Sequence, residues 1–184
     1  MSLEIAQLGQ PVLWERAEEV EPAEILSPAF QEFLREMHAT LLEQKGVGLA
    51  APQVFEGVRV FLGAILPPDE PDGFPNVEAF INPRLTPLTQ EMKSGWEGCL
   101  SFPELLVLVP RYRAVRIDYI DAKGLASTQY LLGFQARVIQ HEHDHLDGIL
   151  TIDRAESKRD IIKASELEAV LEERSEPADE EPEE

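Results

Sequence analysis

The stretch that most constrains this chain is Gln140–Gly148, which reads Gln-His-Glu-His-Asp-His-Leu-Asp-Gly. On an α-helix, His141 and His145 lie one turn apart on the same face, close enough to bind one metal ion. Glu142 follows the first histidine directly, where its carboxylate can act on a water molecule instead of binding the ion. The H-E-x-x-H spacing is typical of metal sites that activate water. The segment therefore predicts a metal-binding helix with a carboxylate base beside it.

The alternative is a solvated helix that merely carries three histidines. At about 100° per residue, one face of the helix presents Phe134, Val138, His141 and His145. Because Ile139 and Leu146 lie on the other side, the helix should be covered nearly all round, as a central helix is. The polar strip of Arg137, Gln140 and Asp144 then needs buried partners. His143 points away from the metal face and is assigned to packing or to the surface.

A catalytic metal site needs a third protein ligand and one position open to water. Cys99 is the only cysteine, so it cannot form a disulfide within the chain. By itself it is either a small buried apolar residue or a reactive or metal-binding thiolate. Within Glu97-Gly98-Cys99-Leu100-Ser101 it is the obvious third ligand, and Glu97 and Asp144 are the competing ones. Asp147, two residues after His145, faces elsewhere and is set aside.

The rest of the chain predicts the fold around this helix. Its 184 residues, 43% of them hydrophobic, suffice for one domain with its own core. Ser27 and Pro28 predict the start of a helix that Gly46 ends. Strands are expected at 58–66, 79–82, 85–93, 105–109, 113–119 and 127–132, with a loop at 67–75 and a hairpin between the last two strands. No βαβ alternation is present, so the fold class is α+β, with mostly antiparallel sheets around a central metal-binding helix.

Small residues are dense in Gly46–Gln53, where the backbone can approach another group closely. Gln53 supplies a side-chain amide donor at the end of this stretch. The stretch lacks the Lys-Ser/Thr of a phosphate loop, and no strand–helix context supports a dinucleotide site.

Charge limits the partners of this chain. A formal net charge of −19 argues against nucleic acid and anionic membranes. Ten acidic residues and one basic residue lie in Glu166–Glu184, which predicts a frayed helix leading into a disordered, solubilising end. We therefore expect a folded domain at 1–165 and an acidic tail at 166–184. Without a membrane-length apolar run or a signal pattern, a cytoplasmic location is expected.

Together, Gly46–Gln53, Glu97–Ser101 and Gln140–Gly148 resemble the three signature motifs of the peptide deformylases, in the same order and at similar separations. The similarity extends to Gly9–Leu13, Phe80–Pro83, Val109–Arg111 and Gly133–Phe134, and so covers the chain to about Asp153. Three matched motifs are highly specific, whereas any one of them would not be.

This resemblance implies that the domain at 1–165 is catalytic and removes the N-formyl group from the initiator methionine of newly made proteins, releasing formate. It also implies one divalent ion per chain, characteristically Fe²⁺, with Zn²⁺, Ni²⁺ or Co²⁺ as replacements. Carried onto this sequence, the metal ligands are Cys99, His141 and His145. Glu142 is then the general base and acid, and Gln53 and the Leu100 backbone N–H resemble the family's oxyanion donors.

A substrate pocket is expected beside the metal. Phe134 and Val138 share the helix face of the two histidines, and with Val47 they would wall an apolar slot for the methionine side chain. The alternative is that these residues are simply core. Gly48 is expected to offer main-chain hydrogen bonds to an extended N-formylmethionyl peptide.

Two features depart from the family. Leu106 stands where many relatives carry a polar or basic residue near the peptide entrance. The acidic tail differs from the basic C-terminal helix by which some relatives dock to the ribosome, so proximity to the ribosome is expected without that helix.

Two rival functions share the H-E-x-x-H spacing: a zincin-like metallopeptidase and a catalytically silent metal-binding homologue.

Overall fold

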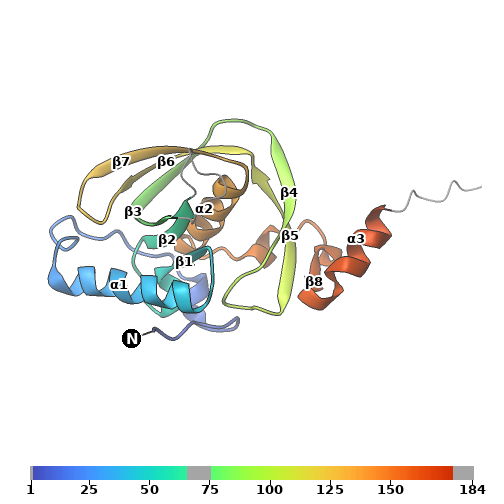
Figure 1. Cartoon of the computed structure of the whole chain (residues 1–184), viewed down its shortest axis with the longest axis horizontal. Helices are drawn as coiled ribbons and strands as arrows, with labels where there is room; N and C mark the ends of the chain where they lie inside the picture. Colours follow the sequence, from blue (N-terminus) through green and yellow to red (C-terminus); the bar gives the residue numbers. More distant parts are fainter. Residues whose placement is uncertain (1, 66–75, 176–184) are drawn as a thin grey trace, which may run out of the picture.

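A computed structural model describes residues 2–65 and 76–175 of the chain. The loop expected at 67–75 and the end of the acidic tail lie outside the described residues. Figure 1 shows the arrangement of the elements, which include short 3-10 turns at Pro11–Trp14 (η1), Ala51–Val54 (η2), Thr151–Arg154 (η3), Lys158–Asp160 (η4) and Ala164–Glu166 (η5).

Helix α1 (Pro28–Glu43) begins where the Ser27–Pro28 pair predicts. The Ser27 hydroxyl accepts a hydrogen bond from the Phe30 N–H at 3.2 Å, which caps the first turn. The buried side of α1 packs against one face of the larger sheet through Leu34, Met37 and Leu41. The helix is therefore amphipathic for a simple reason: one stripe covers the sheet and the other faces water.

The larger sheet has five strands in the order β1-β2-β3-β6-β7, and every neighbouring pair is antiparallel. The strands are β1 (Gly48–Ala50), β2 (Val60–Ile65), β3 (Asn76–Pro87), β6 (Ala114–Ile120) and β7 (Ala126–Leu132). Strand β2 is buried on both faces, with Leu62 in the cluster under α1 and Phe61 in the cluster under helix α2 (Gly133–Leu146). Burial on both faces explains why this strand reads as a continuous apolar run.

The smaller sheet holds β4 (Met92–Glu97), β5 (Leu105–Tyr112) and β8 (Ile161–Lys163), antiparallel and in the order β4-β5-β8. Helix α2 packs against β1, β2 and β7 of the larger sheet and against β5 of the smaller one (Figure 1). Nine of its residues are buried. The α+β class and the central, enclosed helix are thus confirmed.

The boundaries expected at 79–82 and 85–93 are wrong. Residues 76–87 form one strand with an irregularity between Ile81 and Arg84, where Asn82 adopts φ 47 and its side chain bonds the Val20 backbone at 2.8 Å. The strand ends at Pro87, and the Thr89 hydroxyl accepts the Glu91 N–H in the turn before β4. A bulge held by a distant backbone group leaves no periodic signal in the sequence.

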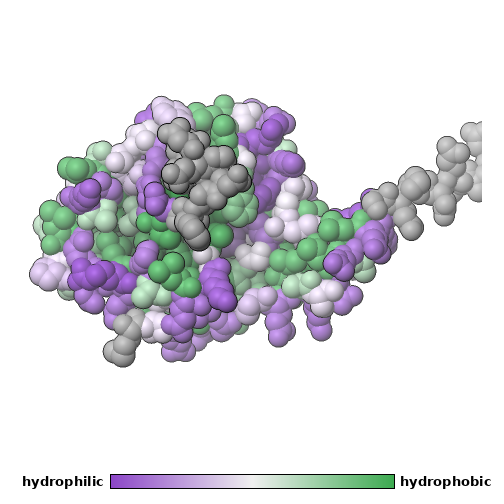
Figure 2. All heavy atoms as spheres, viewed as in Figure 1, coloured by the Kyte–Doolittle hydropathy of each residue, from purple (hydrophilic) through white to green (hydrophobic). Residues whose placement is uncertain are grey.

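The acidic region begins with helix α3 (Leu167–Ser175), which projects from the body beside β8 (Figure 1). Figure 2 shows apolar side chains where this region joins the body and hydrophilic side chains on its outer side. Within residues 2–65 and 76–175, no helix is both long and apolar enough to cross a membrane.

Candidate metal centre

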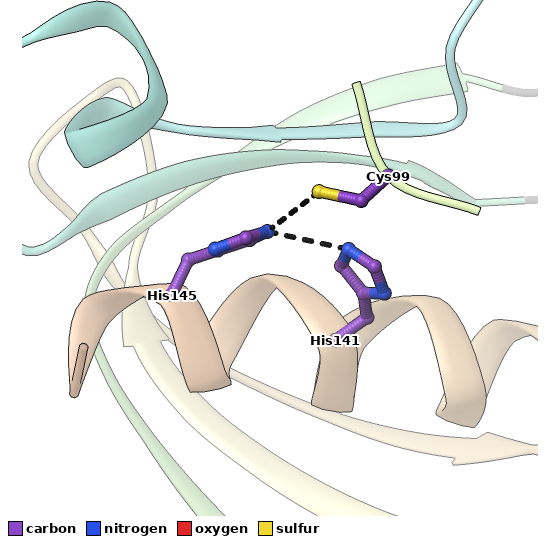
Figure 3. A group of neighbouring side chains, drawn as sticks. All are labelled: Cys99, His141 and His145. Carbon is purple, nitrogen blue, oxygen red and sulfur yellow. Dashed lines mark hydrogen bonds between the residues drawn. The ribbon is translucent and has the colours of Figure 1, made fainter. Parts of the chain in front are cut away.

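Three side chains from two parts of the chain meet at one point (Figure 3). His141 and His145 project from α2, and Cys99 lies in the turn between β4 and β5. The Cys99 Sγ lies 3.4 Å from His145 Nε2, which lies 3.3 Å from His141 Nε2. All three side chains are buried, with 7%, 9% and 1% of Cys99, His141 and His145 exposed.

The spacing of these atoms fits a metal ion. Ligand atoms of the three residues lie within 4.8 Å of one another. A tetrahedral ion with metal–nitrogen bonds of about 2.0–2.1 Å holds two nitrogens about 3.3–3.4 Å apart, close to the distance between the two imidazoles. One sulfur and two nitrogens form a donor set suited to a borderline transition-metal ion. The cluster therefore could hold a divalent metal.

Glu97 orients the first histidine. Its Oε2 lies 3.0 Å from His141 Nδ1, so this nitrogen carries the proton and Nε2 is left to face Cys99. The second histidine is different, because within the described residues His145 Nδ1 is buried without a hydrogen-bond partner.

The surroundings of the cluster favour positive charge. Burial alone would lower the pKa of His141, but hydrogen bonds to Cys99 and Glu97 raise it to about 10. Burial also opposes ionisation of Glu97, yet its bonds to His141 and Arg111 lower the pKa of that carboxyl to about 2. Burial and the charge on His141 hold the pKa of His145 well below its usual value. Cys99 and Glu97, the same groups that raise the pKa of His141, would also favour a bound divalent cation.

Glu142 is a buried carboxylate, 4% exposed, on the helix between the two histidines. Burial raises its pKa to about 7, with a further contribution from Glu97 that the charges of His141 and Arg111 oppose. Its Oε2 has no hydrogen-bond partner in the described part of the chain. The carboxylate approaches β1 so closely that a Cβ on Gly48 would lie 2.6 Å from Glu142 Cγ. A side chain larger than that of glycine at residue 48 would displace the Glu142 carboxylate.

Gln53 reaches the cluster from the η2 turn. Its Oε1 accepts the Ala50 N–H at 2.9 Å, which aims the amide nitrogen at the metal side. That nitrogen lies 3.5 Å from Cys99 Sγ and donates to the Ser101 hydroxyl at 3.2 Å. The dense small residues of the preceding strand thus bring a fixed donor to the cluster.

Known proteins share similarity with most of this chain. A family model described as polypeptide deformylase matches residues 2–160. The chain belongs to the peptide deformylase family. Peptide deformylase 2 of a Nostoc species is 40% identical over 171 residues, which cover 92% of this chain and 94% of that relative. The peptide deformylase of Treponema pallidum is 41% identical over 157 residues, 85% of this chain and 90% of its own.

Solved structures of deformylases show the same fold. A class I type b peptide deformylase from Acinetobacter baumannii matches with a TM-score of 0.77 at 38% identity, over 84% of this chain and 99% of that one. The Thermotoga maritima peptide deformylase matches with a TM-score of 0.75 at 36% identity, over 85% and 99%. Membership of this family separates the chain from the zincin-like peptidases that share its H-E-x-x-H spacing.

The deformylase-family site opens into a cavity of about 410 Å³. Its lining includes every residue expected to contact substrate: Val47, Gly48, Phe134 and Val138. Cys99, Leu100, Gln53, His141 and Glu142 line it as well. Val138 is 5% exposed, whereas Phe134 and Val47 are 62% and 45% exposed at its mouth. Sequence patterns did not identify Lys45, Trp96 and Pro103, which also line this cavity.

The polar strip of α2 finds its partners across the smaller sheet. Gln140 bonds both the N–H and the C=O of Tyr112, at 3.0 and 2.9 Å. Arg137 donates to Glu97 at 2.6 Å, and Asp144 pairs with Arg111. The sequence predicted that this strip needs buried partners but could not identify them, because each contact joins segments that no local pattern links.

Proposed function

We propose that this chain is an active peptide deformylase, a metal-dependent hydrolase that removes the formyl group from N-formylmethionyl peptides and releases formate. Metal-dependent deformylation is the function of the family to which it belongs. The observation that carries the proposal is the buried Glu142 carboxylate in the same cavity as Cys99 and His141, with one oxygen that has no partner among the described residues. A purely structural metal site has no use for such a base.

Cys99, His141 and His145 are the residues that would hold the ion. The ion would supply Lewis acidity, which makes water a better nucleophile near neutral pH and stabilises negative charge on a carbonyl oxygen. The hydrogen bond from His141 Nδ1 to Glu97 fixes the ring orientation and the tautomer, so that Nε2 is the nitrogen available to the ion.

Glu142 moves the proton in the proposed reaction. Its Oε2 takes a proton from the attacking water as the water oxygen bonds to the formyl carbon. The C–N bond then breaks, Glu142 returns the proton to the departing amine nitrogen, and formate leaves. A pKa of about 7 lets the same carboxyl accept and return a proton near neutral pH.

Two donors stabilise the formyl oxygen as it becomes negative. The Gln53 amide nitrogen is pre-aimed by its bond to Ala50, and the Leu100 N–H follows Cys99 directly. Loss of one such donor typically costs about 10²–10³ in rate. Because Gln53 already bonds Ser101, its position is set before substrate arrives.

Peptide recognition is proposed for the same cavity. Val47, Phe134 and Val138 would contact the methionine side chain, and the Gly48 backbone would pair with the extended peptide. The Acinetobacter baumannii relative is described with Met-Ala-Ser bound, so a peptide occupies that protein. A nascent chain is therefore the proposed partner.

We propose Fe²⁺ as the resident ion, because the family characteristically uses it; Zn²⁺, Ni²⁺ or Co²⁺ would replace it. We propose a cytoplasmic location near the ribosome, reached without a basic C-terminal helix. The composition of helix α3 supports the absence of a basic docking helix, since Arg174 is its single basic residue.

The test is anaerobic purification with metal analysis, followed by a formate-release assay. We expect one divalent ion per chain, and turnover of a formyl-Met-Ala-Ser peptide but not of its unformylated twin. Cleavage of the unformylated peptide would indicate a peptidase. Metal binding without formate release would indicate a silent homologue.

Glu142→Gln is the matched variant, because it keeps the shape of the side chain and removes the base. We expect unchanged metal content and loss of turnover. Retained turnover would show that Glu142 is not the base.

A further inference from the structure

Arg154 is the outermost member of a charged network that reaches the candidate metal ligands. It lies in the η3 turn (Thr151–Arg154), and its side chain is 43% exposed. Its guanidinium donates two hydrogen bonds to the Asp144 carboxylate, Nε to Oδ2 at 3.0 Å and Nη2 to Oδ1 at 2.6 Å. A two-bond contact of this kind fixes both the position and the plane of a carboxylate.

Asp144 connects Arg154 to the buried part of the network. The same Oδ2 that accepts from Arg154 also accepts from Nη1 of Arg111, which is 4% exposed. Arg111 in turn makes two bonds to Glu97, Nε to Oε1 at 3.1 Å and Nη2 to Oε2 at 3.0 Å. Glu97 Oε2 then meets His141 Nδ1 at 3.0 Å.

Signs alternate along this path, as a buried network requires. Arg111 stands between two buried carboxylates, and Arg154 supplies Asp144 with a second cation, as Arg137 does for Glu97. Without Arg154, the Asp144 carboxylate would keep only its ion pair with Arg111. The Arg111 guanidinium would then shift toward Asp144 and away from Glu97. The Glu97 carboxylate would then hold the His141 ring less firmly.

We propose that Arg154 is a positioning residue for the metal site, acting through Asp144, Arg111 and Glu97 on the orientation of His141. The inference rests on the proposed function, since it takes His141 as a ligand. Arg154 is not among the residues that line the 410 Å³ cavity, so its effect should fall on metal binding and not on peptide binding. The η3 turn that carries Arg154 is itself held in place, because its first residue, Thr151, and the preceding Leu150 are buried.

The experiment compares Co²⁺ binding by the full-length wild type, Arg154→Ala, Arg154→Lys and the control Arg113→Ala. The control removes an arginine from a surface ion pair, Arg113 with Glu91, whose side chains are 56% and 61% exposed. Affinity is measured by chelator competition and ligand geometry by the visible absorption of Co²⁺. Thermal unfolding and the KM for a formylated peptide are measured alongside.

In R154A we expect about tenfold weaker Co²⁺ binding, as for other residues that support metal ligands. We also expect a changed Co²⁺ spectrum and an unchanged KM. R154K should fall between R154A and the wild type, because an ammonium keeps the charge but loses the two-bond grip. R113A should match the wild type.

Equal Co²⁺ affinity and spectrum in R154A and wild type would overturn the inference, as would an equal loss in R113A. If R154A does not fold, R154K decides, and affinity equal to the wild type overturns the inference. A wild type that releases formate and binds Co²⁺ keeps the proposed function whatever the variants do. If the wild type neither releases formate nor binds Co²⁺, both the proposed function and the inference about Arg154 are wrong.

Discussion

Single residues in this site are constrained by what stands next to them more than by their own preferences. Gly48 is the clearest case, because its φ is ordinary and glycine is required only by the nearness of Glu142. Val138 is a second case, since it is buried on α2 and yet lines the cavity. Both positions lead to predictions that separate chemistry from binding.

Gly48→Ala should leave metal binding intact and reduce kcat. The new methyl group would overlap the Glu142 side chain and force the carboxylate to move, and a displacement of about 1 Å can cost about 10²-fold in rate. Formate release and metal content are the measurements. Gly57→Ala is the control, because nothing lies within 4 Å of a Cβ built there. Wild-type kcat in Gly48→Ala would place the working carboxylate elsewhere.

Val138→Phe should raise the KM for formyl-methionyl peptides by about tenfold or more, because the larger ring fills space that the methionine side chain would use. Metal content should stay the same, since the substitution leaves all three proposed ligands in place. Steady-state kinetics at fixed metal loading measure the effect. Unchanged kinetics would remove Val138 from the pocket and assign it to the core alone.

At the scale of elements, strands β3, β6 and β7 are tied by one polar cluster as well as by their ladders. Tyr119 of β6 is 7% exposed; its hydroxyl donates to Glu78 of β3 at 3.1 Å and accepts from Gln129 of β7 at 2.7 Å. Its ring lies 4.4 Å from that of Phe80. The Tyr119 side chain thus links three strands, through the hydrogen bonds of its hydroxyl and the packing of its ring.

This link predicts a pH dependence of stability. Burial, with the charge and hydrogen bond of Glu78, raises the pKa of Tyr119 to about 12. Because the folded pKa exceeds the unfolded value of about 10, the contribution is fully present below pH 10 and is lost as pH rises through about 12. Absorbance titration should show a late tyrosine phase near pH 12, which Tyr119→Phe removes. A titration curve that Tyr119→Phe leaves unchanged above about pH 10 would contradict the prediction.

At the scale of the whole molecule, the two sheets enclose α2 and bring the β4–β5 turn to its histidines. The acidic C-terminal region contributes little to this arrangement. Helix α3 is mostly exposed. Its Arg174 donates to Asp160 and to the Arg159 carbonyl at 3.1 and 3.0 Å, and the guanidinium lies 5.3 Å from the centroid of the Trp96 ring. The division into a domain at 1–165 and a tail at 166–184 remains a prediction.

A chain shortened to residues 1–165 should therefore fold, bind metal and release formate. The Arg174–Asp160 ion pair and the Arg174–Trp96 contact contribute about 1 kcal/mol each, so the thermal midpoint should fall by no more than about 8 °C. Calorimetry and the formate assay on both chains test this. A much larger loss of stability, or of formate release, would show that α3 belongs to the catalytic domain.

The sequence by itself determined the helix that carries the two histidines, the α+β class and the residue types able to bind metal. These follow from local rules, since the 3.6-residue period places His141 above His145 whatever surrounds them, and only one cysteine exists. The Ser27 cap follows from the same kind of rule. Even the need of Arg137, Gln140 and Asp144 for partners could be deduced, because burial of such groups without partners is costly.

Only the tertiary structure decided which partners these are. Residues 97, 111, 144 and 154 meet because β4 pairs with β5 and because α2 and η3 both pack against β5, and no periodicity spans those separations. The same holds for the Asn82 bulge and for the fit of Gly48 against Glu142. Local patterns specify what an element presents on each face; packing alone specifies what that face meets.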